Sequence, residues 1–264
     1  EDAERTRKNL KKKLTGTMDL ASRVAKFVDC RSRNPAEREI FIVEGDSALG
    51  ACKQARDPNF QAIMPIRGKI LNCLKADYGR IFKNDIITDL IKVLGCGVQV
   101  RSKANRDLSS FNMQALRWSK IILCTDADVD GYQIRTLLLT MLYRLTPALI
   151  EAGKVFIAES PLFEIQSGDR TYFAYTEKEK DEFLARLKER KYTIQRSKGL
   201  GENEPDMMNL TTMNPATRRL IRVMPEQAER TARVFDLLLG DDLSGRKNFI
   251  AENGRYYMEL ADLS

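Results

Sequence analysis

The chain has 264 residues, of which 43% are hydrophobic and 31% charged, and this composition predicts a soluble globular protein with one large or two modest domains. No apolar stretch approaches the roughly 20 residues that cross a bilayer and no signal peptide opens the sequence, so membrane and secreted classes are excluded and a cytoplasmic location is expected. Histidine is absent and the five cysteines include no CxxC pair, which argues against histidine catalysis, a disulfide framework and a zinc site.

The first part of the chain alternates strand patterns with helix patterns. Residues 1–14 are a basic helical stretch without a full apolar face, and 1–35 are assigned to an amino-terminal connector. Strands are expected at 40–44, 61–66, 120–125 and 154–159, where short apolar runs are bounded by polar residues. Helices are expected at 46–56, 84–95 and 134–145, where apolar residues recur at helical spacing. Strands alternating with helices predict an α/β fold with a parallel sheet.

The pattern changes near Pro161, where we place a domain boundary at about residue 160. A hairpin is expected at 161–175, followed by a helix that Thr176 and Glu179 begin as a capping box. A strand then leads into the glycine-rich loop RSKGLGE, and the pattern from Glu204 onward is helical with proline and glycine punctuation. This second part is therefore expected to be a smaller, mostly helical α+β region.

Residues 121–131 read IILCTDADVDG, in which Asp126, Asp128 and Asp130 follow a short apolar strand. This spacing matches the start of an EF-hand calcium loop, but the twelfth position is Leu137 instead of glutamate, and the preceding segment is a strand instead of a helix. We therefore reject an EF-hand. Three crowded carboxylates favour a hard divalent cation, although an ordinary acidic turn explains this stretch equally well.

A fourth carboxylate, Glu44, ends the expected strand 40–44. Ligands of open parallel sheets lie at the carboxyl ends of the strands, so Glu44 and the three aspartates are expected to meet at one edge. Such a cluster would bind magnesium, act on a phosphodiester and leave Glu44 to transfer a proton. The net charge of +7 suits a polyphosphate partner, although it is also a common solubility trait.

Five motifs occur in one order: EGDSALGACKQARD, PIRGKILN, TDADVDGYQIRTLLLTMLYR, RSKGLGE and TTMNPATRRL. In order and spacing they resemble the metal-binding Toprim region and tail of the bacterial type IIA topoisomerase B subunits, gyrase B and its topoisomerase IV counterpart ParE. The resemblance covers nearly the whole chain from about residue 35. It implies a Rossmann-like Toprim domain at 36–160 and a carboxy-terminal tail region at 161–264.

The resemblance also implies roles for particular residues. Glu44, Asp126, Asp128 and Asp130 match the magnesium ligands, with Mn²⁺ or Ca²⁺ able to replace magnesium in binding, and Glu44 matches the general acid/base. DNA contacts are implied at Lys69, Asn72, Gln133, Lys198 and Arg246. These are residue types that contact phosphate and sugar, although solvated surface positions explain them as well.

Two positions depart from the family pattern. Gln133 stands where a histidine is usual, so we expect a changed DNA contact and retained activity. Ser197 stands where an aromatic residue is common before KGLGE, so the stacking ring is missing there. Neither position belongs to the acidic cluster.

The implied partners are double-stranded DNA and a topoisomerase A subunit, GyrA or ParC, which supplies the nucleophilic tyrosine within an A2B2 heterotetramer. No Walker motif and no ATPase motif occurs in the sequence, so the chain is expected to be the carboxy-terminal part of a longer, ATP-hydrolysing topoisomerase. Two alternatives stay open. Another Toprim enzyme, a primase or nuclease, would share the acidic cluster but not PIRGK or RSKGLGE, and a non-catalytic nucleic-acid-binding module would use the acidic loop only as a turn.

Overall fold

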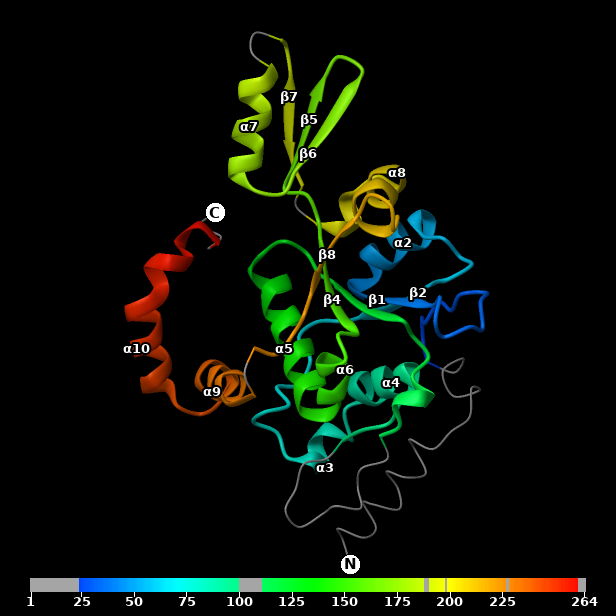
Figure 1. Ribbon diagram of the computed structural model, residues 1–264, viewed down its shortest axis with the longest axis vertical. Helices are drawn as coiled ribbons and strands as arrows, with labels where there is room; N and C mark the ends of the chain where they lie inside the picture. The colour runs from blue at the N-terminus through cyan, green and yellow to red at the C-terminus, as the bar shows by residue number, and fades with distance from the viewer. Residues whose placement is uncertain (1–23, 100–110, 188–189, 198, 227, 261–264) are drawn as a thin grey trace, which may run out of the picture.

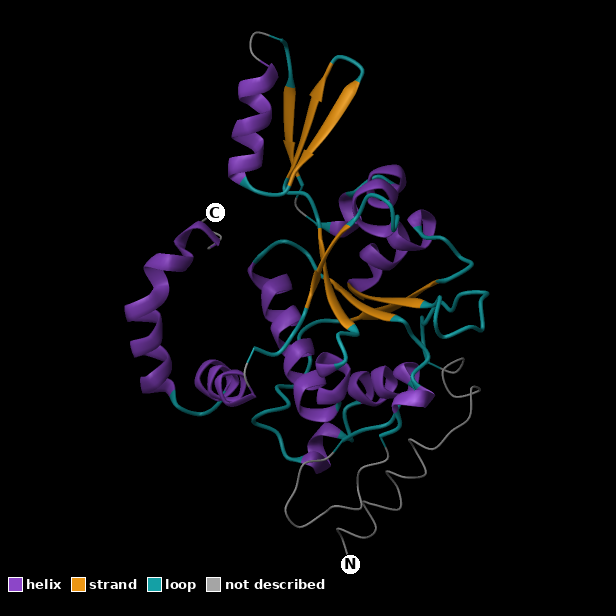
Figure 2. Ribbon diagram, in the orientation of Figure 1, coloured by secondary structure: helices purple, strands orange, loops and turns teal. Residues whose placement is uncertain are grey.

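The computed structural model describes residues 24–99, 111–187, 190–197, 199–226 and 228–260. Its centre is a five-stranded sheet in the order β2–β1–β3–β4–β8, shown in Figures 1 and 2. The strands are β1 (Glu39–Glu44), β2 (Gln61–Ile66), β3 (Lys120–Cys124), β4 (Val155–Glu159) and β8 (Arg219–Arg222). The first four are parallel, which confirms the predicted α/β fold. β8 runs antiparallel to β4 and lies in a segment that we expected to be helical, so that expectation was wrong there.

Helices cover both faces of this sheet. On one face lie α4 (Asp85–Leu94), α5 (Val129–Leu145) and α6 (Pro147–Glu151), and on the other lie α2 (Gly45–Ala55) and α8 (Pro205–Met208), as Figure 1 shows. Alternation along β1 explains the two layers, because Ile40 and Ile42 belong to the core under α4 and α5, whereas Phe41 and Val43 belong to the core under α2. The strand is therefore buried on both faces, as expected of a parallel sheet.

Short elements complete this part of the fold. They are α3 (Tyr78–Ile81) and the 3₁₀ turn η3 (Met113–Ala115). The predicted stop of α4 is confirmed, because Gly95 closes the helix at φ +81°, and at its start the Asn84 side chain accepts a hydrogen bond from the Ile87 N–H. The five cysteines are buried and unpaired. No helix in the described ranges is long and apolar enough to cross a membrane.

A small unit projects from the sheet after Pro161 (Figure 1). It contains β5 (Phe163–Ser167), β6 (Arg170–Ala174), α7 (Glu177–Leu187) and β7 (Thr193–Arg196), with the antiparallel order β6–β5–β7. Phe163, Ile165 and Leu187 form its own core. The predicted hairpin and helix are confirmed, and the Thr176 hydroxyl accepts from the Glu179 N–H at 3.1 Å as the capping box requires.

The tail returns to the sheet before it leaves again. It comprises η4 (Leu200–Glu202), α8, the π-helical turn η5 (Asn209–Met213), β8, α9 (Ala228–Leu239), α10 (Leu243–Asn253) and η6 (Gly254–Leu260). Helices α9 and α10 form an arc beside the body of the molecule, and the rings of Tyr143 on α5 and Phe235 on α9 stack at 4.4 Å. The tail supplies β8 to the sheet of the first domain. The domain boundary that we placed at about residue 160 therefore stays a prediction.

Candidate metal and nucleic-acid site

The carboxyl ends of β1 and β3 bring Glu44 and Asp126 together. The two strands are neighbours, with Val43 opposite Cys124, so the residues that follow them share one edge of the sheet. Glu44 Oε2 accepts a hydrogen bond from the Asp126 N–H at 3.3 Å, across 82 residues of sequence. The predicted meeting of these two acidic positions is therefore present in the structure.

The acidic loop is shaped by the start of α5. Asp128 caps this helix, because its Oδ1 accepts from the Gly131 N–H at 2.7 Å. Gly131 permits the tight turn, since a Cβ there would lie 2.1 Å from the Asp126 carbonyl oxygen. Asp130 lies in the first helical turn and its Oδ1 contacts the Lys69 ammonium at 2.8 Å. The motif DVDG thus directs its aspartates to different partners.

Asp126 receives its partner from the tail. The Leu200 N–H donates to Asp126 Oδ1 at 2.8 Å, although the two residues are 74 positions apart. Leu200 begins η4, which packs on α2, and its side chain is buried in the core on that face of the sheet. The glycine-rich loop is therefore part of the acidic site.

Burial, and after it the neighbouring negative charges, raises the pKa of two half-buried carboxyl groups. Burial raises the pKa of Glu44, the Asp126 N–H partly offsets this, and the charges of the three aspartates raise the pKa further. Burial also raises the pKa of Asp126, the Leu200 N–H opposes the rise, and the charges of Asp128 and Glu202 add to it. A bound cation would relieve this repulsion.

The donor chemistry of the four carboxylates fits magnesium, which prefers oxygen ligands. Their side chains do not converge in this conformation, because within the described ranges no three acidic or cysteine side chains lie close enough together to hold an ion. Instead, each carboxylate has a partner of its own, either a backbone N–H or the Lys69 ammonium. Magnesium binding by these carboxylates would therefore require a change of side-chain conformation.

The residues expected to contact DNA fall into two groups. Lys69 and Gln133 are exposed beside the acidic loop. Asn72 and Arg246 lie at the carboxyl end of α9, where the Asn72 amide donates to the Leu239 carbonyl at 3.1 Å and the Arg246 guanidinium to the Gly240 carbonyl at 2.7 Å. Lys198 lies outside the described residues. In this conformation Asn72 and Arg246 hold the end of a helix, and their DNA contacts stay a prediction.

Sequence reasoning missed three cations around the cluster. Arg135 is one turn after Gly131 on α5, is partly buried, and donates to the Thr125 hydroxyl at 3.3 Å. Burial lowers the pKa of Arg135, and its electrostatic interactions with Tyr132, Cys124, Glu159 and, least, Glu44 oppose this. Lys26 and Arg67 contact the Asp46 carboxylate at 2.5 and 3.0 Å. Arg135 could have been identified from the sequence, because it lies four residues after Gly131 and therefore on the same side of the helix. Nothing in the sequence indicates that Lys26 and Arg67 contact Asp46.

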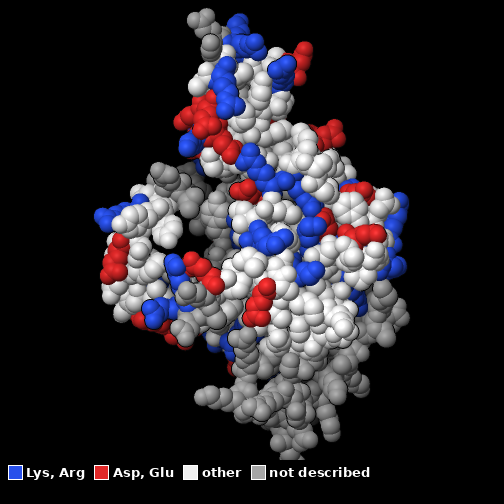
Figure 3. Space-filling model, in the orientation of Figure 1, with Lys and Arg blue, Asp and Glu red and all other residues white. Residues whose placement is uncertain are grey.

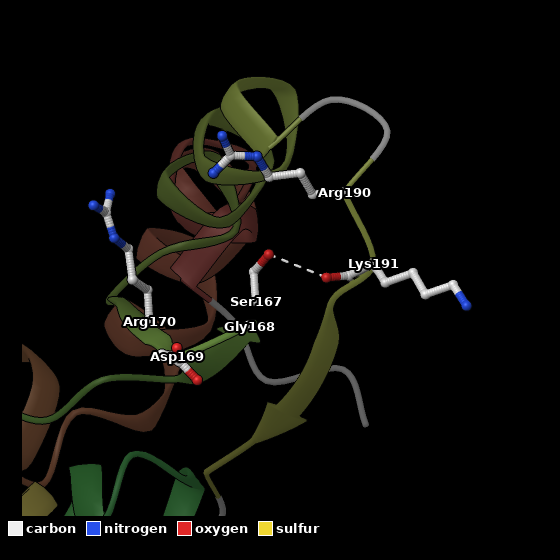
Figure 4. Close-up of a pocket in the computed structure, with 6 residues that line it drawn as sticks. All are labelled: Ser167, Gly168, Asp169, Arg170, Arg190 and Lys191. Carbon is white, nitrogen blue, oxygen red and sulfur yellow. Dashed lines mark hydrogen bonds between the residues drawn. The ribbon is translucent and has the colours of Figure 1, made fainter.

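Positive charge is also prominent away from this edge. Figure 3 shows Lys and Arg side chains along the middle of one face and at the tip of the projecting unit. At that tip a notch of about 530 Å³ is lined by Ser167, Gly168, Asp169, Arg170, Arg190 and Lys191. Figure 4 shows Arg170 and Lys191 pointing away from each other, so the notch does not surround a small anion.

Two family models match the chain in the order that the motifs indicated. The Toprim domain matches residues 39–160, and the model described as DNA gyrase B subunit, carboxyl terminus, matches residues 189–251. The chain belongs to the gyrase B family. The second match favours this family over other Toprim enzymes, because it lies in the tail that follows the acidic site.

Relatives in the gyrase B family match over nearly all of the chain. The sequence is 43% identical over 260 residues to the DNA gyrase B protein of Thermotoga maritima, a match that covers 98% of this chain and 39% of the relative. It is 45% identical over 235 residues to the DNA gyrase B protein of Archaeoglobus fulgidus, covering 89% and 35%. For the DNA gyrase B protein of Staphylococcus aureus the identity is 44% over 240 residues, covering 90% and 36%. The chain thus spans less than two fifths of the length of these relatives.

Proposed function

We propose that this chain supplies the metal-binding half of the DNA cleavage and religation site of a type IIA topoisomerase. The observation that carries the proposal is the hydrogen bond that joins Glu44 to Asp126 at the ends of two neighbouring parallel strands. Membership of the gyrase B family supports it, because the acidic motifs lie within the part of the chain that the Toprim model matches. Cytoplasmic location and double-stranded DNA as substrate belong to the same proposal.

Glu44, Asp126 and Asp128 would hold magnesium, with Asp130 as an outer ligand, and Mn²⁺ or Ca²⁺ would replace magnesium in binding. The ion would polarise the phosphodiester and stabilise the departing oxygen. Glu44 would transfer the proton, and a raised pKa brings a carboxyl group closer to working pH as a general acid. Because Glu44 Oε2 already accepts the Asp126 N–H, we assign proton transfer to Oε1.

The attacking tyrosine is proposed to come from an A subunit, GyrA or ParC, in an A2B2 assembly. Tyr132 is the tyrosine nearest the acidic loop in sequence, but it follows Gly131 directly and its ring lies beside Arg135, 5.3 Å from the guanidinium. The sequence contains no histidine that could activate it as a general base. ATP-driven strand passage is proposed only for the longer protein.

A cleavage assay with a cognate A subunit tests the proposal. The chain, the A subunit, gapped duplex DNA and Mg²⁺ would be mixed and quenched with detergent, and covalent DNA on the A subunit would be measured. Asp128→Asn should nearly abolish the adduct, while Asp169→Asn, an exposed aspartate in the β5–β6 turn, should leave it unchanged. Wild-type adduct levels with Asp128→Asn would refute the site. Pairing the full-length B subunit with its own A subunit, and assaying negative supercoiling and decatenation, would distinguish a gyrase from a topoisomerase IV.

A further inference from the structure

The loop Gly199–Glu202 contacts the acidic edge through its backbone. Besides the hydrogen bond from the Leu200 N–H to Asp126 Oδ1, the loop approaches both the aspartate and the start of α2 closely. Leu200 is buried, with 1% of its surface exposed, so its side chain anchors the N–H donor against the core. The buried Leu200 side chain therefore holds its own N–H in a fixed position toward Asp126.

Two glycines make the close approach possible. A Cβ at Gly199 would lie 3.1 Å from Asp126 Oδ2, and a Cβ at Gly201 would lie 2.5 Å from the Ser47 Cβ and 3.1 Å from the Ser47 carbonyl carbon. Neither glycine has a positive φ, so glycine matters at both positions for space and not for backbone conformation, and the space is tightest at Gly201. At Gly199 the missing side chain leaves room next to the second oxygen of Asp126.

We propose that Gly199–Glu202 is a positioning element of the metal site. The Leu200 N–H fixes the Asp126 carboxylate by its Oδ1 before a cation arrives, and Gly199 keeps the space beside Oδ2 open for that cation. The inference rests on the proposed function for the identity of the ligand, a hard divalent cation. It extends that function because it makes a tail segment, and not only the Toprim domain, necessary for tight metal binding.

Replacing the Leu200 amide with a backbone ester removes the N–H and keeps the buried side chain. We expect the affinity of the full chain for Mn²⁺, followed by electron paramagnetic resonance of the free ion, to fall about 10- to 100-fold, as is typical when a partner of a metal ligand is lost. Leu200→Ala keeps the N–H and removes the anchor, so it should lower the melting temperature more than the ester does. The ester should lower the Mn²⁺ affinity more than Leu200→Ala does. If the loop served only the fold, Leu200→Ala would lower the Mn²⁺ affinity more than the ester.

Glycine variants give a second measurement. Gly199→Ala should weaken Mn²⁺ binding by crowding Oδ2, whereas Gly50→Ala, on the exposed side of α2 with nothing within 4 Å of its added Cβ, should not. Unchanged Mn²⁺ affinity in both the ester and Gly199→Ala would overturn the inference and leave the proposed function intact. If wild type bound no Mn²⁺, or Asp128→Asn bound it as tightly as wild type, the inference and the proposed metal site would both fall.

Discussion

A buried ion pair connects the tail to the central sheet, and its removal should destabilise the whole chain. The Arg218 guanidinium contacts both oxygens of Glu39 at 2.6 Å, and their side chains are only 4% and 3% exposed. Lys120 contacts Glu39 at 2.9 Å from the next strand, and the Gln61 amide donates to it from β2. Glu39→Gln would leave the Arg218 charge buried without its counterion.

Breaking a buried pair from one side costs about 3–5 kcal/mol, because the remaining charge stays out of water. We expect the free energy of unfolding, measured by urea denaturation, to fall by about that amount. Glu37→Gln, an exposed change two residues earlier, should cost less than about 1 kcal/mol. Glu39→Leu combined with Arg218→Met should recover most of the loss, since apolar replacement of a buried pair is often neutral. A loss below about 1 kcal/mol for Glu39→Gln would refute the view that the Glu39–Arg218 ion pair connects the tail to the sheet.

The same pair should make stability depend on acid. Burial alone would raise the pKa of Glu39, but the hydrogen bonds and charges of Arg218 and Lys120 outweigh it and hold the pKa below its ordinary value of 4.5. The unfolded chain then binds the proton more readily, so the contribution is complete above about pH 4.5 and is lost as the pH falls through the folded pKa. Wild type should therefore lose more stability than Glu39→Gln as the pH falls from neutral to well below about 4.5.

Three further predictions concern the acidic edge. Lys69→Ala should weaken binding of a nicked duplex and reduce the slope of log affinity against log salt by about one unit, with Lys178→Ala on α7 as control; an unchanged slope would make Lys69 a partner of Asp130 only. Gly131→Ala should abolish Mn²⁺ binding, because its Cβ would meet the backbone of Asp126 at 2.1 Å, and retained binding would contradict that geometry. The chain alone, incubated with Mg²⁺ and supercoiled plasmid, should form no covalent adduct, so DNA attached to this chain would disprove a shared active site.

The sheet and its acidic edge were predictable because the signals are local. Apolar runs located β1 to β4, and the rule that parallel strands end at one edge brought Glu44 to Asp126. β8 was missed because RLIR has two apolar residues between exposed arginines and pairs only with β4, at the border of the sheet. A short strand at an edge needs less burial, so its apolar pattern was too weak to stand out from the helical pattern expected there.

Contacts made by backbone groups or by flexible cations could not be read from the sequence. The Leu200 N–H is a donor that every residue except proline carries, so nothing in the motif RSKGLGE names Asp126 as its acceptor. The family resemblance implied DNA contacts for Asn72 and Arg246, and nothing in the sequence indicated that both side chains would also bind carbonyl groups at the end of α9. Residue type limits what a side chain can bind, and the fold decides which partner is within reach.

The order in which the chain leaves and rejoins the central sheet makes the projecting unit a natural place for engineering. The unit follows β4 in the chain, and the chain later returns to pair with β4 as β8. The segments before and after the unit therefore belong to the same sheet. The β5–β6 turn of this unit, Gly168–Asp169, is exposed and closes a hairpin, and the unit has its own small core. A fluorophore or a short peptide tag inserted there would lie outside the acidic edge and would leave the spacing of the strands beneath undisturbed.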